Sequence, residues 1–326
     1  MRNYIIRRVL QMVVTLILVS IMTFVVIQLP PGDYLTSYVA QLSQAGQTMD
    51  QETLRSLEIR YGLDQPMYVQ YFKWIGGFAR GDFGYSFDWK MPVRPLIAER
   101  LVLTIILTLF TMVFTWIVAF LIGVYSASHK YSIGDYLATF VGFIGISIPG
   151  FLLAMIVMWM AISVFNTSVG GLFSTQYVNA AWSWARWKDL LSHITLPAVI
   201  IGLSGTASLI RTLRANLLDE LTKPYVSAAK AKGVPVRRLM LKYPLRIAML
   251  PFISTVGWTI PDIISSQTIV GVVLSLPILG PMLLTSLKNQ DMYLAGTILL
   301  FLSVLTVLGT FISDILLAWA DPRVRY

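Results

Sequence analysis

The sequence predicts an all-α polytopic membrane protein. We expect six transmembrane helices, a large extracytoplasmic loop after the first of them, and a short cytoplasmic helix between the fourth and the fifth. Of 326 residues, 56% are hydrophobic and 13% are charged, whereas a soluble domain carries about 25% charged residues. Uncharged stretches recur along the chain, and most approach or exceed the ~20 residues that a helix needs to cross a bilayer.

Composition also argues against several kinds of site. The chain has no cysteine and two histidines, which excludes thiolate chemistry and disulfides and disfavours an imidazole metal cluster. The net charge of +9 is explained by its distribution over the loops, so a nucleic-acid partner is unnecessary. We expect no metal and no cofactor bound by this chain.

The first transmembrane helix is expected at the N-terminus, in a segment of residues 1–29. Three arginines precede the uncharged run 9–29, and basic residues before an apolar run also describe a signal peptide. The run is long and lacks a small-residue cleavage pattern, so we interpret it as an uncleaved span with a cytoplasmic N-terminus.

Residues 30–100 are polar and predict an extracytoplasmic cap, which either covers the bundle or offers a docking surface. Thr48 and Gln51 form a capping-box pattern. The elements expected here are a helix over 49–61 that ends at Gly62, a second helix from Pro66, and turns at Gly81 and Gly84.

Five further spans are expected in the core, residues 101–320, before a cytoplasmic tail at 321–326. The uncharged or nearly uncharged runs that predict them are 101–128, 136–165 (interrupted by Gly142, Gly145 and Pro149), 194–210 (starting at a Pro197 kink), 248–273 and 293–320. This topology places 15 of the 25 basic residues and four acidic ones in cytoplasmic segments, as the positive-inside rule requires.

The loop at 211–247 contains the expected short helix. Thr222 is a favourable N-cap, Pro224 fits the first turn, and Gly233 fits the position after the last turn. A helix of about ten residues is only ~15 Å long and cannot span. It lies either against lipid headgroups or against a partner.

The sequence of this short helix carries a resemblance. Residues 227–233, Ser-Ala-Ala-Lys-Ala-Lys-Gly, resemble the cytoplasmic E-A-A-x-x-x-G loop of permease subunits of bacterial ABC importers, with Ser227 in place of Glu. The chain looks like the first permease of the dipeptide/oligopeptide/nickel branch. Further similar motifs are PGD (31–33), YGLDQPMYVQYFKW (61–74), GDFGYSF (81–87), SIPGFLL (147–153), LRIAMLP (245–251) and DPRVR (321–325).

The resemblance implies a multi-pass protein of a prokaryotic cytoplasmic membrane, with both termini cytoplasmic. It implies four partners besides lipid: a second permease, two ATPases and an extracytoplasmic solute-binding protein. Because the chain has no G-x-x-x-x-G-K-[ST] loop, ATP and Mg²⁺ belong to the ATPases and this subunit is not an enzyme. The implied ATPase-coupling residues are Tyr225, Val226, Ser227, Ala228, Ala229, Lys230, Ala231, Lys232 and Gly233.

Candidates for the translocation pathway are Ser147, Pro149, Asp262 and Gln267. A carboxylate inside a span is costly and usually faces a cavity, although Asp262 can also lie near the outer interface or pack beside Ser265 and Ser266. The resemblance implies peptides as cargo. Departures from the family pattern at Gln267-Thr268 and at 277–280 leave oligosaccharides open.

Two alternatives come from other classes. Gly202-Leu203-Ser204-Gly205 spells the nucleophile signature of intramembrane proteases, but that chemistry needs a general base, and both histidines, His129 and His193, precede it. Close helix packing through small residues is the preferred interpretation. An ion-coupled secondary transporter is disfavoured, because the six spans show no two-fold repeat.

Overall fold

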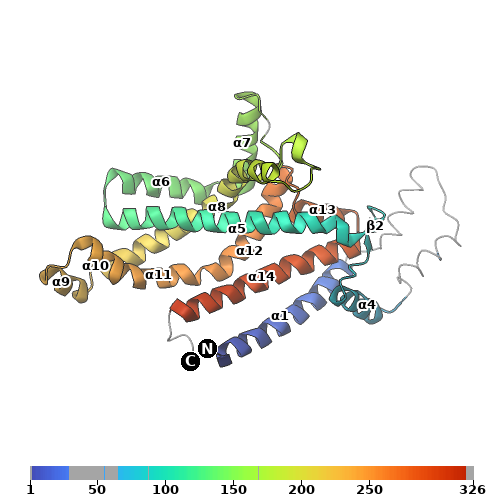
Figure 1. Ribbon diagram of the computed structural model, residues 1–326, viewed down its shortest axis with the longest axis horizontal. Helices are drawn as coiled ribbons and strands as arrows, with labels where there is room; N and C mark the ends of the chain where they lie inside the picture. Colours follow the sequence, from blue (N-terminus) through green and yellow to red (C-terminus); the bar gives the residue numbers. More distant parts are fainter. Residues whose placement is uncertain (1, 29–54, 56–64, 87, 168, 321–326) are drawn as a thin grey trace. The chain divides into compact units, whose positions relative to one another are not determined.

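The computed structural model describes residues 2–28, 55, 65–86, 88–167 and 169–320. Within these ranges the predicted all-α polytopic fold is confirmed, apart from one hairpin of two short strands, and the helix expected over 49–61 lies outside them. In this described part of the chain, four helices are long and apolar enough to cross a membrane, and two bent helix pairs raise the number to as many as six. The four single helices are α1 (Arg2–Gln28), α5 (Val93–Ser128), α8 (Trp184–Leu221) and α14 (Met292–Ala320) (Figure 1).

The expected third span is two helices, α6 (Ile133–Ser147) and α7 (Gly150–Ser163), whose axes bend by 102°. Pro149 causes the break, because its ring disfavours helical geometry at the preceding residue. Ile148 accordingly has φ −95° and ψ 120°, and Pro149 itself is the N-cap of α7.

The expected fifth span is also a pair, α11 (Pro244–Ser254) and α12 (Val256–Val273), bent by 47°. Pro261 lies inside α12 without ending it. Its missing N–H leaves the carbonyl of Gly257 without a helical donor, and the Thr310 hydroxyl of α14 donates to that carbonyl at 3.3 Å. A neighbouring helix thus satisfies the freed group, as membrane helices require.

The fourth span begins earlier than predicted. The helix α8 starts at Trp184 and runs for 38 residues with Pro197 inside it, so the expected start near residue 194 is wrong. The N-cap Ser183 accepts from the backbone N–H of Arg186 at 3.3 Å, which is the local signal for the true start. A short helix before the last span, α13 (Leu279–Lys288), was not expected.

The chain divides into two compact units, each assembled from separate segments. The first comprises residues 1–9, 105–277 and 308–326, and the second comprises 10–104 and 278–307. In the first, a buried core joins α5, α8 and α11 through Ala119, Leu213 and Phe252, one from each helix. In the same unit Arg8 pairs with Asp314 at 3.0 Å, so a costly intramembrane carboxylate has a cationic partner.

The second unit contains α4 (Met67–Ala79), which begins directly after Pro66 as predicted and packs on α1. The hydroxyls of Tyr71 and Ser20 lie 2.8 Å apart. The predicted turns are confirmed by positive φ angles of 79° at Gly81 and 80° at Gly84. A two-stranded hairpin follows, β1 (Tyr85–Ser86) and β2 (Met91–Pro92).

Candidate functional site

The predicted short helix exists as α9 (Pro224–Ala231), 8 residues long. The expected N-cap is wrong: Thr222 is the C-cap of α8, and its hydroxyl donates to the carbonyl of Asp219 at 2.7 Å. Lys223 is the N-cap of α9, with Pro224 in the first turn as predicted. Only two residues, Thr222 and Lys223, therefore separate the end of the long helix α8 from α9.

The end of α9 is a Schellman motif, as the predicted role of Gly233 requires. The N–H of Gly233 donates to the carbonyl of Lys230 at 2.9 Å, and that of Val234 donates to the carbonyl of Ala229 at 3.2 Å. These two bonds define the motif. Gly233 has φ 75°, a left-handed conformation that glycine adopts without strain. The chain thus leaves α9 in one fixed direction.

Two contacts hold α9. Val226 is 2% exposed and supplies its apolar anchor. The Tyr225 hydroxyl donates to Oε2 of Glu220 on α8 at 2.6 Å. Burial, followed by the hydrogen bond with Glu220, raises the pKa of Tyr225 to about 12, so the phenol remains a donor at physiological pH.

The rest of α9 faces outward. Ser227, Ala228 and Ala231 are exposed and small, and Ala229 is half-buried. A Cβ atom built on Gly233 meets no atom within 4 Å. A helix face of small side chains allows another backbone to approach closely. Of the predicted coupling residues, Tyr225 to Ala231 lie on this one short helix and Lys232 and Gly233 follow directly after it, so the set is anchored on one side and accessible on the other.

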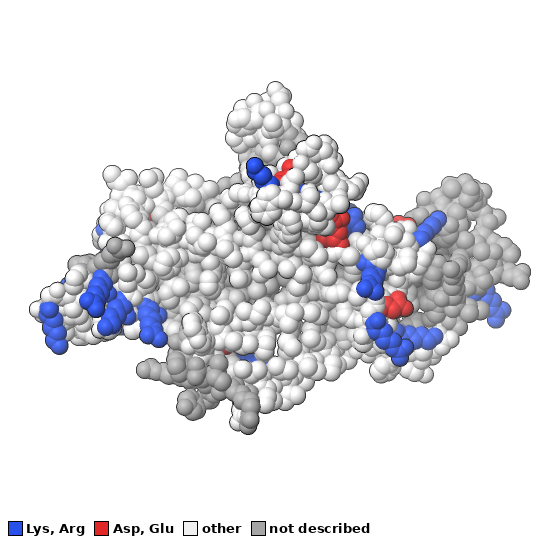
Figure 2. Space-filling model, viewed as in Figure 1, with Lys and Arg blue, Asp and Glu red and all other residues white. Residues whose placement is uncertain are grey.

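Basic side chains surround this face. Figure 2 shows Lys and Arg side chains gathered where α9 and α10 (Val236–Lys242) lie. The exposed basic residues of this patch, among those that the structure describes, are Lys230, Lys232, Arg238, Lys242 and Arg246. Such a patch attracts acidic side chains or anionic headgroups.

Of the four pathway candidates, three are exposed and one is buried. Ser147 and Pro149 are exposed at the bend between α6 and α7. Asp262 is exposed on α12, whereas Gln267 is 1% exposed, and its Nε2 lies 3.2 Å from the Thr108 hydroxyl on α5. Gln267 thus joins α12 to α5, and the other three present their side chains at the surface of this unit.

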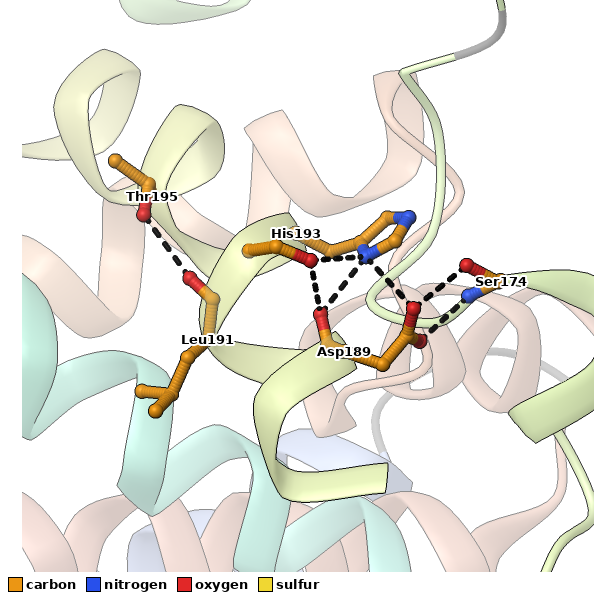
Figure 3. A network of polar contacts seen from close by, with 6 residues as sticks. Ser174, Asp189, Leu191, His193 and Thr195 are labelled. Carbon is orange, nitrogen blue, oxygen red and sulfur yellow. Dashed lines mark hydrogen bonds and ion pairs between the residues drawn. The ribbon is translucent and has the colours of Figure 1, made fainter. Parts of the chain in front are cut away.

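The connection from α7 to α8 carries a polar network at the start of α8 (Figure 3). Ser174 donates to Asp189 from its backbone N–H at 2.8 Å and from its hydroxyl at 2.6 Å. His193 Nδ1 lies 2.8 Å from the Asp189 carbonyl oxygen. Asp189 lies between the other two and Ser174 gives its proton to the carboxylate, so this is a loop anchor rather than a nucleophile with its base.

A buried arginine fixes the same connection. Arg186 is 3% exposed and lies 4.6 Å from the ring centroid of Phe173 and 4.4 Å from that of Trp182. Its guanidinium also donates to the carbonyl oxygens of Ala180, at 2.5 Å, and Val178, at 3.1 Å. The planar guanidinium can stack on aromatic rings and donate two hydrogen bonds at the same time, which a lysine ammonium group at this position could not do equally well.

The Gly202–Gly205 motif is a packing site. A Cβ on Gly202 would lie 2.5 Å from Oγ1 of Thr115 on α5, so α5 and α8 approach at a distance that only glycine permits. Both described histidines are engaged elsewhere: His129 stacks on Tyr125 with ring centroids 4.7 Å apart, and His193 contacts Asp189. The packing interpretation agrees with this geometry.

Sequence reasoning missed a buried ion pair. Asp135 and Arg214, which are among the charges counted above in the expected cytoplasmic segments, form a two-pronged contact in which Arg214 Nε donates to Asp135 Oδ1 and Nη2 donates to Oδ2, each at 2.8 Å. The Asp135 side chain is 3% exposed. The two residues are 79 positions apart in the sequence, so no local pattern joins them. The one indication in the sequence that Asp135 has a partner was its being a single acidic residue in a basic loop.

The second unit contains a cavity of about 400 Å³. Aromatic side chains form much of its wall, and Lys73 and Asp82 contribute opposite charges. Asp82 accepts from the Gly84 N–H at 3.0 Å. Apart from Tyr293, the lining residues belong to the segment expected to form the extracytoplasmic cap.

The chain matches known families along nearly all of its length. Residues 1–108 match the N-terminal family of binding-protein-dependent transport system membrane components, and residues 119–326 match the binding-protein-dependent transport system inner membrane component. An oligopeptide transport system permease protein, AppB of Bacillus subtilis, is 37% identical over the whole of both chains. A glutathione transport system permease protein, GsiC of Escherichia coli K12, is 32% identical over the whole of both. A putative peptide permease of Brucella ovis is 28% identical over 100% of this chain and 99% of its own. The chain therefore belongs to the family of binding-protein-dependent transport system inner membrane components, as a multi-pass permease subunit of an ABC importer.

Proposed function

We propose that this chain forms half of the translocation pathway of an importer for short peptides, with a second permease as the other half. The observation that carries the proposal is α9, whose small-residue face is exposed while Val226 and Tyr225 anchor its other side. Two ATPase subunits bind ATP and Mg²⁺ and receive this helix, and the permease itself is not catalytic. A solute-binding protein delivers the cargo from the outer side.

The fixed exit of α9 supports its role as the contact with an ATPase. A helix bound to an ATPase transmits the movement of that ATPase to the permease only if the helix is joined rigidly to its neighbours. At the start of α9, Tyr225 is hydrogen-bonded to α8. At its end, the Schellman motif at Gly233 fixes the direction of the following chain. Lys230 and Lys232 are exposed beside the small-residue face and suit a partner surface with acidic side chains.

The names of the relatives support peptides as cargo, since two are described as peptide permeases and one as a glutathione permease. Ser147, Pro149, Asp262 and Gln267 are the proposed pathway residues. Of these, the exposed carboxylate of Asp262 suits the cationic amino terminus of a peptide.

The orientation we propose has both termini in the cytoplasm. Arg8 near the start of α1 pairs with Asp314 near the end of α14, which supports their lying on the same side. The basic residues near α9 support that side being the cytoplasmic one.

Reconstitution tests the proposal. The chain is combined in proteoliposomes with the second permease, the two ATPases and the binding protein of the same organism, and uptake of labelled short peptides and of a labelled maltodextrin is measured. We expect peptide uptake that requires internal ATP and every subunit. Maltodextrin uptake alone would reject the peptide assignment. Uptake by this chain alone, driven by an ion gradient, would reject the ABC mechanism.

A further inference from the structure

The helices α6 and α8 pack side by side in opposite directions within the first unit (Figure 1). Asp135 meets Arg214, a Cβ on Gly142 would lie 3.6 Å from the Cβ of Ala207, and one on Gly145 would lie 2.9 Å from Leu203. Along these three contacts the residue numbers of α6 rise while those of α8 fall by nearly the same amount, so the two antiparallel helices are in contact along most of the length of α6. Gly145 lets the backbones approach closely, whereas the position of Gly142 has room for a Cβ atom.

The ion pair lies at the end of this helix pair that is nearer to α9. Arg214 precedes the C-cap Thr222 by two turns of α8, or about 12 Å. Asp135 is in the first turn of α6, where it also accepts from the backbone N–H of Tyr131 at 3.0 Å. The carboxylate thus holds the α5–α6 turn as well as α8.

The other end of the helix pair is the break at Pro149. A Cβ on Gly150, the first residue of α7, would lie 3.8 Å from the carbonyl oxygen of Ile200 on α8 and 3.5 Å from a methyl group of Val270 on α12. The α6–α8 contact therefore extends from the neighbourhood of α9 to the residue at which the chain turns by 102° into α7.

We infer that α6 and α8 move as one body, and that Asp135 and Arg214 are positioning residues that carry displacement of α9 to the break at Pro149. This inference rests on the proposed coupling role of α9. A guanidinium and a carboxylate joined by two parallel bonds accept only one relative placement, whereas apolar side chains can slide past one another with little loss of contact.

The burial of the pair explains why it resists sliding. The Asp135 side chain is 3% exposed and that of Arg214 27%. A shift of one helix along the other would leave a charge buried without its partner, which is strongly unfavourable. A buried ion pair is best attested as a device that fixes register.

A cross-link tests whether the two helices move together. The chain contains no cysteine, and the 3.6 Å separation between a Cβ on Gly142 and that of Ala207 suits a disulfide. In the reconstituted transporter, Gly142→Cys with Ala207→Cys should transport peptide equally well before and after oxidation. If oxidation blocks transport and reduction restores it, the helices move relative to each other and the inference is overturned.

Charge variants test the role of the pair in transmission. We expect Asp135→Asn and Arg214→Gln to raise the ATP hydrolysed per peptide imported by about tenfold, within the usual range of coupling between sites, with the ATPases still co-purifying. Exchange of the two charges, Asp135→Arg with Arg214→Asp, should restore part of the ratio. Arg211→Gln, an exposed arginine one turn away on α8, is the control and should leave the ratio unchanged.

The outcomes separate this inference from the proposed function. An unchanged ratio in both single variants overturns the inference, while ATP-driven peptide uptake by the unaltered complex keeps the proposed function. Loss of ATPase binding in Asp135→Asn also overturns it, because the pair would then serve assembly rather than transmission. If the unaltered complex takes up no peptide with ATP, the proposed function itself fails.

Discussion

The Tyr225 hydroxyl donates a 2.6 Å hydrogen bond to Oε2 of Glu220 across the junction between α8 and α9. Lys223 pairs with Asp219 over the same junction at 3.2 Å. Both contacts join the last turn of α8 to the start of α9. The junction is therefore held by two side-chain contacts to α8, one from the linking residue Lys223 and one from Tyr225 in the first turn of α9.

We expect Tyr225→Phe to loosen this junction without unfolding it. A partly exposed hydrogen bond contributes about 0.5–1 kcal/mol, which corresponds to about a two- to fivefold fall in the initial rate of ATP-driven peptide uptake. Tyr243→Phe is the control, because the ring of Tyr243 contacts the Lys242 ammonium group, which lies 5.3 Å from the ring centroid, and phenylalanine keeps that ring. Equal uptake by both variants would contradict the role of Tyr225.

The pH dependence of this contact follows from the raised pKa of Tyr225, about 12. A phenol with a raised pKa stabilises the folded state below its ordinary pKa of about 10 and loses that effect as the pH rises toward 12. The ratio of unaltered to Tyr225→Phe uptake should therefore stay constant between about pH 6 and pH 9.

Gly233 offers a test of α9 as the contact with the ATPases. An aspartate there adds backbone strain of about 1 kcal/mol and a negative charge beside the basic face. We expect Gly233→Asp to abolish most ATP-coupled uptake while membrane insertion persists. Uptake is measured at equal protein levels together with ATPase co-purification.

A matched control exists for this variant in the other unit. Gly81 has φ 79° and, like Gly233, meets no atom within 4 Å of a built Cβ. Gly81→Asp thus carries a similar strain in equally open space, far from α9 in the sequence. If both variants lose uptake to the same extent, the effect belongs to strain rather than to docking.

Features with a local chemical cause could be predicted from the sequence. Pro66 before α4, the positive φ angles of Gly81, Gly84 and Gly233, and the number of apolar runs are examples. Thr222 shows the limit of local signals. Its side chain suits an N-cap, but α8 continues to Leu221 and uses Thr222 to end itself, because packing of Leu213 and Leu217 in the core extends that helix.

Features that depend on contacts between residues far apart in the sequence could not be predicted from the sequence. A proline at 149 indicates a break, but the 102° angle depends on what α6 and α7 pack against. Asp135 has the composition of a loop charge, and only the approach of α8 gives it a partner 79 residues later. The candidate pathway residue Gln267 is buried against Thr108 for the same kind of reason.

We expect a valine at Gly202 and a valine at Gly205 to have opposite effects on the stability of the subunit. Gly202→Val should destabilise the subunit by about 1–3 kcal/mol through overpacking, because its Cβ would lie 2.5 Å from Thr115 Oγ1. Gly205→Val should be tolerated, since its Cβ would be 3.9 Å from Thr115. Thermal unfolding of the purified complex measures both.

Ser204→Ala should keep full uptake of peptide. Loss of uptake in this variant would indicate that the serine of the motif has a chemical role.

Asp291 predicts a pH dependence in the second unit. It is fully buried and accepts from the Ser86 hydroxyl, from the Asp88 N–H at 3.2 Å and from the Leu294 N–H at 3.2 Å. Burial raises the pKa of its carboxyl above the ordinary value, against the lowering effect of these hydrogen bonds. A carboxyl with a raised pKa stabilises the fold most when protonated, and the effect is lost as the pH rises through the folded-state pKa.

The asparagine variant cannot titrate, so it isolates this effect. We expect the Tm of the unaltered complex minus that of Asp291→Asn to increase as the pH falls from about 8 to about 4. Asp291→Ala should cost about 1–3 kcal/mol at every pH, because the buried Ser86 hydroxyl and the Leu294 N–H then lack an acceptor. A Tm difference between the unaltered complex and Asp291→Asn that shrinks on acidification would mean that the hydrogen bonds outweigh burial, and that Asp291 stabilises this unit as a carboxylate.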